Sequence, residues 1–205
     1  MSAVSAGLFT WVQGADFYRD HLRGVVELLP PGEGDTLLDI GCGPGLLTRL
    51  AAARGYRAVG LDVDQHMVAA AKRIALRERS TATFETVDLH AAPTRLTPAD
   101  VVAAASLLAV MPDRHVALEM LWRSVAPGGL LLVVEATEDM TVRAARRLLT
   151  NGLPGRRSRL LIRWASGREG RTVDPRIYED LPNVTEKRLV PLLSGLVGAW
   201  LFQKN

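Results

Sequence analysis

Short apolar runs alternate with amphipathic stretches along the chain as far as Glu135. The apolar runs predict buried strands at residues 36–40, 58–61, 82–87, 100–105 and 130–135. Apolar residues at helical spacing predict helices at 15–29, 46–54, 65–77 and 114–125, the last of them ended by Pro127-Gly128-Gly129. Strands that alternate with helices form a parallel sheet with helices on both faces. The pattern therefore predicts an α/β fold.

The pattern changes after Glu135. Residues 141–150 and 156–165 place apolar positions opposite arginines and predict two helices. Two apolar runs, at 188–193 and 196–203, follow them, and we expect a buried pair of strands there. The apolar segment that these two runs form is too short to span a bilayer as a helix. Because 205 residues suffice for one well-buried core, we expect residues 1–205 to form a single domain.

Charge is unevenly distributed along the chain. The net charge is +3, but residues 141–171 contain nine arginines and one acidic residue, Glu169. We call this range the basic segment and expect a helical insertion or lid. Its arginine stems would pack on the core with their charges in solvent, or they would bind an acidic acceptor. A peripheral membrane contact is a further alternative. Nucleic acid is disfavoured, because one basic patch without regular interleaving of aromatic residues is thin support for it.

A glycine-rich loop follows the first predicted strand, in the sequence LLDIGCGPG at 37–45. Glycine lets the backbone turn sharply and lets a ligand lie against bare peptide. The helix that follows presents unpaired N–H groups. Dinucleotide-binding loops have the spacing GxGxxG and hold a pyrophosphate, whereas this loop is GxGxG. Asp39 lies two residues before the first glycine, where it would repel a pyrophosphate and suit a ligand with a cationic amino-acid end.

Three aspartates end the first three predicted strands in order: Asp39, Asp62 and Asp88. They share the carboxyl edge of the sheet, where open α/β sheets bind ligands. A carboxylate at Asp62 would accept two hydrogen bonds from ribose hydroxyls, and Asp88 would bind an adenine amino group. The alternatives are turn residues at Asp39 and Asp88 and a helix cap at Asp62.

These segments resemble class I S-adenosylmethionine (SAM)-dependent methyltransferases, in particular the small-molecule branch. The similar segments are LLDIGCGPG, VGLDVDQHMVAAAKR (59–73), TVDL (86–89), SLLAVMPD (106–113) and LWRSVAPGGLLLVVE (121–135). The resemblance implies a Rossmann-like, seven-stranded, mostly parallel sheet with helices on both faces and an antiparallel last strand. It also implies SAM as cofactor and methyl transfer to a small-molecule acceptor.

The resemblance further implies which residues hold SAM. The loop glycines would cradle its methionine part, and Asp39 would orient the loop or bind the amino group through water. Asp62 would hold the ribose, while Val63 and Met67 would pack on adenine. The complete implied set is Asp39, Gly41, Cys42, Gly43, Gly45, Asp62, Val63, Met67, Asp88, Leu89 and Ser106. Within it, Cys42 is a small packing residue, the Leu89 backbone reads the adenine edge, and Ser106 faces the methionine end.

The sequence identifies no catalytic residue with the same clarity. The family often has histidines after SLL, where this chain has Ala109 and Val110. Cytosine C5 methylation needs a cysteine nucleophile, which Cys42 in the glycine loop does not supply. We expect no metal, since acidic ligands at the fourth and fifth strand ends are incomplete. His90 and His115 follow strand ends and are the candidates for a base.

Two alternatives to a small-molecule methyltransferase stay open at this point. An RNA or protein methyltransferase would use the basic segment as a docking surface. A non-catalytic SAM-binding partner subunit would keep the cofactor site and lack acceptor chemistry. The chain has one cysteine and no basic region before an apolar stretch at its start, which indicates a cytoplasmic protein. The pattern leaves the oligomeric state open.

Overall fold

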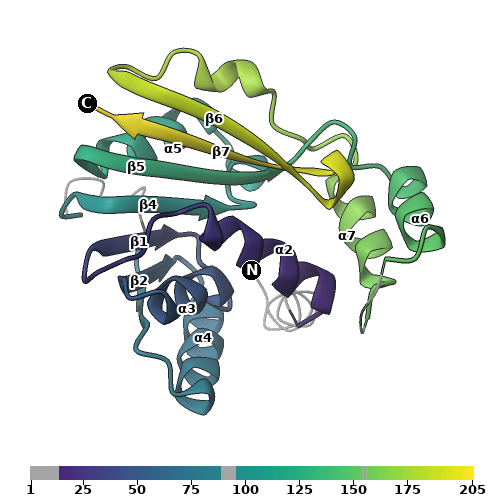
Figure 1. Cartoon of the computed structure of the whole chain (residues 1–205), viewed down its shortest axis with the longest axis horizontal. Helices are drawn as coiled ribbons and strands as arrows, with labels where there is room; N and C mark the ends of the chain where they lie inside the picture. Colours follow the sequence, from purple (N-terminus) through teal and green to yellow (C-terminus); the bar gives the residue numbers. More distant parts are fainter. Residues whose placement is uncertain (1–13, 89–95, 154, 156) are drawn as a thin grey trace.

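A twisted seven-stranded sheet runs through the molecule, as the computed structural model shows for residues 14–88, 96–153, 155 and 157–205 (Figure 1). The strand order is β3-β2-β1-β4-β5-β7-β6. The strands are β1 (Thr36–Ile40), β2 (Arg57–Asp62), β3 (Thr83–Thr86), β4 (Ala99–Ala105), β5 (Val125–Ala136), β6 (Val184–Leu192) and β7 (Val197–Lys204). β1 to β5 pair in parallel, and β7 is antiparallel to both β5 and β6. The predicted fold class is confirmed.

Helices cover both faces of the sheet. The helices before β4 are α2 (Asp16–Glu27), α3 (Leu46–Ala53) and α4 (Gln65–Glu78), and α5 (Arg114–Arg123) lies between β4 and β5. Alternate residues of the central strands separate the two cores: Val101 and Leu132 pack with α2 and α3, whereas Val102 and Leu131 pack with α5. This division follows from the two-residue period of a strand. The short 3₁₀ turn η2 (Pro175–Tyr178) adds Tyr178 to the α5 side.

Two helices of the basic segment lie beyond the carboxyl ends of β4 and β5, beside α2 (Figure 1). They are α6 (Val142–Thr150), capped by the Thr141 side chain, and α7 (Leu160–Arg168). α2 and α7 meet through buried rings, with ring centroids 5.2 Å apart for Tyr18 and Trp164 and 5.7 Å for His21 and Trp164. The basic segment is therefore packed on the side of the sheet where ligands bind in open α/β folds.

Two predicted helix boundaries and the predicted burial of one strand are wrong. α5 ends at Arg123, because Val125 already pairs with Ala99, so that β5 includes the predicted helix stop at residues 127–129. α7 begins at Leu160 and not at residue 156, because Arg157 has a φ of 61°, a conformation that a right-handed helix does not contain. The predicted buried strand pair is half correct, since β7 is buried but β6 is a largely exposed edge strand.

The connection from β3 to β4 contains no helix in its described parts, residues 87–88 and 96–98. A cavity of about 800 Å³ opens beside it, on the sheet face opposite α3 and α4. Its walls include Leu38, Val59 and Leu61. Across the described ranges, no helix combines the length and apolarity that a membrane span requires.

Candidate functional site

The glycine-rich loop has a left-handed backbone at each of its three glycines. The φ angles are 73° at Gly41, 52° at Gly43 and 75° at Gly45. The loop is tied to the end of β2, because the N–H groups of Gly41 and Cys42 donate to the Leu61 carbonyl at 2.8 and 3.0 Å. Side chains other than glycine rarely adopt this conformation, so the loop presents bare backbone.

The space around the loop also requires glycine. A Cβ at Gly41 would lie 2.7 Å from Cδ1 of Leu107, and a Cβ at Gly45 would overlap the Phe84 ring. Real Cβ atoms essentially never approach a neighbour this closely. Gly41 and Gly45 therefore lie directly against neighbouring side chains of the protein, which would have to move to admit a Cβ.

Asp62 connects this loop to the turn after β2. Its Oδ2 accepts a hydrogen bond from the Gly43 N–H at 2.8 Å, and its Oδ1 accepts one from the Asp64 N–H at 2.9 Å. The side chain that caps α4 is Asp64, which accepts from the His66 N–H at 2.8 Å. The helix-cap alternative for Asp62 is therefore wrong. An ionised carboxylate has about four acceptor positions, which leaves room for hydroxyl donors.

Asp39 is fully enclosed and holds the start of α3. Its Oδ2 accepts hydrogen bonds from the Thr48 hydroxyl at 2.6 Å and from the Thr48 N–H at 3.1 Å. Burial raises the pKa of Asp39 to about 7, and the Thr48 hydrogen bonds oppose that rise. Asp39 thus orients the helix that follows the loop, which is more than a turn residue at a strand end would do.

Arg49 supports the loop from behind. It is 8% exposed, and its Nη1 donates to the Pro44 carbonyl at 2.6 Å while its Nε donates to Glu78 Oε2 at 2.9 Å. The sequence reasoning missed both Thr48 and Arg49. The sequence indicated Thr48 and Arg49 only through their position in the first turn of the helix after the loop.

Cys42 packs beneath the loop, against Val68 and Phe84. Burial raises the pKa of its thiol, and the nearby carboxylates of Asp39 and Asp62 raise it further. A thiol that stays protonated is a poor nucleophile, which agrees with the packing role expected from the sequence.

The remaining residues predicted to bind SAM differ in their burial and position. Val63 is 65% exposed, whereas Met67 is buried. Asp88 is exposed and lines the cavity beside β3. Ser106 follows β4 with a φ of 58°, and its N–H donates to the Val134 carbonyl at 2.7 Å. Leu89 and His90 lie outside the described residues.

His115 is exposed near the start of α5. It lines a second cavity, of about 740 Å³, between α5 and η2, and none of the predicted cofactor residues line that cavity. Nothing in its surroundings identifies it as a base. Within the described ranges, no three His, Cys, Asp or Glu side chains are placed to hold a metal ion.

The buried carboxyl of Asp39 leads to a prediction for stability. Because its folded-state pKa is above its ordinary value of 3.8, its contribution to stability is present below about pH 4 and is lost as the pH rises to about 7. We expect Asp39→Asn to gain on the order of 2 kcal/mol relative to the wild type between pH 5 and pH 8. Urea unfolding at both pH values measures this. The exposed Asp35→Asn control should show no such gain, and equal pH profiles for wild type and Asp39→Asn would contradict the prediction.

Comparison with known proteins places this geometry in context. Residues 37–129 match a family model described as a methyltransferase domain. The chain is 31% identical over 184 residues to a trans-aconitate 2-methyltransferase of Methylobacterium radiotolerans, which covers 80% of this chain and 64% of the relative. It is 34% identical over 113 residues to a 2-methyl-6-phytyl-1,4-hydroquinone methyltransferase of Synechocystis, which covers 55% of this chain and 35% of the relative. The chain thus spans less than two thirds of the length of either relative.

A solved structure shares the fold over nearly the whole chain. The magnesium protoporphyrin IX methyltransferase of Synechocystis, with bound S-adenosylhomocysteine (SAH), superposes with a TM-score of 0.69 at 16% identity. The match covers 98% of this chain and 95% of that chain. This chain therefore shares its overall fold with that structure.

Proposed function

We propose that this chain, which belongs to the class I SAM-dependent methyltransferase family, transfers a methyl group from SAM to a small, acidic acceptor. The observation that carries the proposal is the hydrogen bond from the Gly43 N–H to Asp62 at 2.8 Å. It brings the bare backbone of the loop and the carboxylate at the end of β2 together at one edge of the sheet.

Each part of this edge has a separate task. The loop backbone would bind the methionine part, Asp62 would accept hydrogen bonds from the ribose hydroxyls, and Asp39 and Arg49 hold the loop and α3 in place. Bound SAM supplies a methyl group on a sulfonium, which is a strong electrophile. The chain then has to align the acceptor with that methyl group and exclude water. This work requires no strong base, in agreement with the surroundings of His115.

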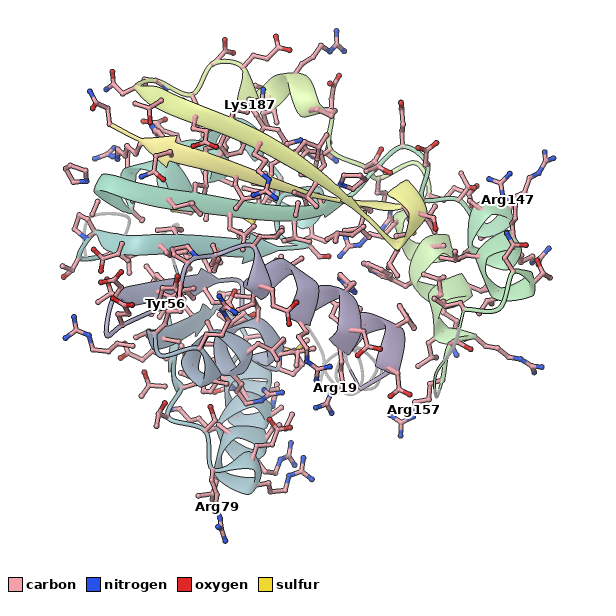
Figure 2. All side chains as sticks on the ribbon, viewed as in Figure 1. Arg19, Tyr56, Arg79, Arg147, Arg157 and Lys187 are labelled. Carbon is pink, nitrogen blue, oxygen red and sulfur yellow. The ribbon has the colours of Figure 1, made fainter. Side chains whose placement is uncertain are left out.

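The acidic acceptor is supported by the basic segment. Its two helices, α6 and α7, lie beyond the carboxyl ends of β4 and β5, and Arg147 and Arg157 point outward from α6 and from the turn before α7 (Figure 2). The planar guanidinium group of arginine can donate two parallel hydrogen bonds to a carboxylate. One relative is named for trans-aconitate, an acidic small molecule.

Methyl transfer can be tested directly. The wild-type protein should bind SAM in a calorimetric titration and transfer a tritiated methyl group to at least one member of a panel of di- and tricarboxylic acids that includes trans-aconitate. Absence of SAM binding would refute the function itself. Transfer to RNA with strong salt dependence, and to no small acid, would favour the RNA alternative.

Loss of charge in the basic segment should affect the acceptor and spare the cofactor. Arg156 of the basic segment lies outside the described residues. We therefore choose the exposed residues Arg157, Arg159 and Arg163. Replacing all three by glutamine should raise the KM of the acid acceptor about tenfold, since single exposed charges contribute little and several act together. SAM affinity should stay unchanged.

The matched control neutralises three exposed arginines elsewhere, Arg73, Arg77 and Arg123. Steady-state kinetics at low salt should show no KM change in this control. An equal rise in the acceptor KM in both triple variants would indicate a general effect of the protein's positive charge. No rise in KM in either variant would support the alternative that the basic segment is a solvated surface.

The proposal extends to the whole chain. We infer that residues 1–205 form one methyltransferase domain with the basic segment as its lid. The single cysteine, Cys42, is a buried free thiol, which supports a cytoplasmic location.

A further inference from the structure

Glu135 is a buried carboxylate near the end of β5 that the predicted cofactor site does not use. It is 1% exposed and lies on the α5 side of the sheet. Burial raises its pKa to about 7, while the positive charges of Arg168 and Arg114 oppose the rise. Burying a carboxylate is costly unless hydrogen bonds compensate for the lost water. Its partners therefore indicate what it does.

Those partners belong to the segment after β4. Glu135 Oε1 accepts hydrogen bonds from the N–H groups of Leu108 at 2.6 Å and Ala109 at 3.4 Å. These residues open the 3₁₀ turn η1 (Leu108–Val110). Two residues earlier, Ser106 donates its N–H to Val134 of the same strand at 2.7 Å. β5 thus holds this segment at two points, one of them a side chain.

Arg168 reaches the same segment from the opposite direction. It is the last residue of α7, is only 7% exposed, and donates from Nη2 to the Ser106 carbonyl at 3.3 Å. The chain just beyond α7 is held as well, because Arg114 donates from Nη1 to the Thr172 carbonyl at 2.9 Å. Unlike the exposed arginines of the basic segment, Arg168 joins that segment to the carboxyl end of β4.

Glu135 and Arg168 hold a stretch of backbone that contains an unfavourable conformation at Ser106. Ser106 has a φ of 58°, in the left-handed region that residues other than glycine rarely adopt. Such a conformation persists only where the surroundings determine it. Here the surroundings are the hydrogen bonds from Ser106 to Val134, from Arg168 to Ser106, and from η1 to Glu135.

We propose that Glu135 and Arg168 are positioning residues for methyl transfer: together they fix the backbone of residues 106–109 and couple the basic segment to it. The inference rests on the proposed function and on the position of Ser106 near the methionine end of SAM that the sequence resemblance implies. Glu135 acts as an acceptor for two N–H groups, and Arg168 acts as a donor to one carbonyl. Neither side chain needs to contact the cofactor or the acceptor.

Conservative and disruptive variants separate this role from others. Glu135→Gln keeps an oxygen that accepts from Leu108 and Ala109, whereas Glu135→Ala removes it. Arg168→Lys keeps a donor for Ser106, whereas Arg168→Met removes it. Exposed side chains of the same type in α5, Glu119 and Arg123, provide the matched controls Glu119→Ala and Arg123→Met.

Two measurements need no acceptor. Hydrogen exchange of the Leu108 and Ala109 amides should speed up at least tenfold in Glu135→Ala and stay near wild type in Glu135→Gln. SAH affinity, measured by calorimetry, should fall about tenfold in Glu135→Ala and Arg168→Met, and should stay within about threefold in Glu135→Gln, Arg168→Lys and both controls. With an acceptor from the carboxylic-acid panel, Arg168→Met should lower kcat more than it raises KM.

The proposal is overturned if a folded Glu135→Ala keeps wild-type exchange and affinity, or if Glu135→Gln loses as much as Glu135→Ala, since charge and not positioning would then matter. Should Glu135→Ala fail to fold, the Glu135→Gln and Arg168 variants decide the question by the same criteria. Failure of the wild type to bind SAH would refute the proposed function, whereas the exchange data would still judge the positioning of residues 106–109.

Discussion

A valine at position 43 should abolish SAM binding while the protein stays folded. Gly43 has a φ of 52°, and a β-branched residue adopts such a backbone only under strain. Its N–H donates to Asp62, so that a shift of the backbone would also disturb the carboxylate expected to hold the ribose. Under the proposed function, a branched side chain at this position would also occupy space needed by the ligand. We expect a loss of binding of at least a hundredfold in a calorimetric titration, combining strain of about 1–3 kcal/mol with ligand exclusion.

The control for Gly43→Val separates backbone strain from loss of the cradle. Gly128 has a φ of 73°, and no atom lies within 4 Å of the place that a Cβ would take there, so Gly128→Val introduces similar strain in open space. Both variants should lower the melting temperature to a similar degree, and only Gly43→Val should lose SAM. Normal binding by a folded Gly43→Val protein would show that the loop is not the cofactor cradle.

Asp62→Ala should weaken SAM binding about a hundredfold. From the ribose hydroxyls alone, the expected cost is about 1–3 kcal/mol. The structure places the effect toward the upper end, because the N–H groups of Gly43 and Asp64 also lose their acceptor. The cofactor would then meet a loop that is less well held, in addition to losing a partner. Calorimetric titration of SAM measures the change.

Asp64 provides the comparison for this variant. It lies two residues away and is also buried, but its side chain caps α4. Asp64→Ala should cost about 1 kcal/mol of stability, as the loss of a helix cap does, and should leave SAM affinity near wild type. Unchanged affinity in folded Asp62→Ala would rule out the ribose role.

Local patterns were sufficient for the order of helices and strands because the elements have a recognisable period and several of them end close to a glycine or proline. They failed where tertiary pairing overrides a local signal. Pro127-Gly128-Gly129 resembles a helix stop, yet the pairing of Val125 with Ala99 includes it in β5. The left-handed Arg157 that delays α7 is likewise a feature of the three-dimensional packing and not of hydrophobic spacing.

The candidate site likewise contains residues that the sequence could indicate and residues that it could not. The glycines and Asp62 could be predicted because a loop and a strand end carry a recognisable spacing, and the structure brings them into contact. The ties that hold this machinery could not, because Arg168 and Ser106 are 62 residues apart and no periodicity links them. The SAM-binding roles of the glycines and Asp62 remain predictions, as do the adenine-binding roles of Val63, Met67 and Asp88.

The exposed edge strand β6 has a consequence for how molecules meet. An open strand edge is a template on which another chain can extend the sheet. The exposed edge strand carries Lys187 and Arg188, and the addition of a further strand would remove water from their charges. Pro191 has no N–H group that could donate a hydrogen bond to an added strand. At the opposite edge, β3 is only four residues long. The sheet is therefore terminated on both sides by its own sequence, which disfavours growth by strand addition from one molecule to the next.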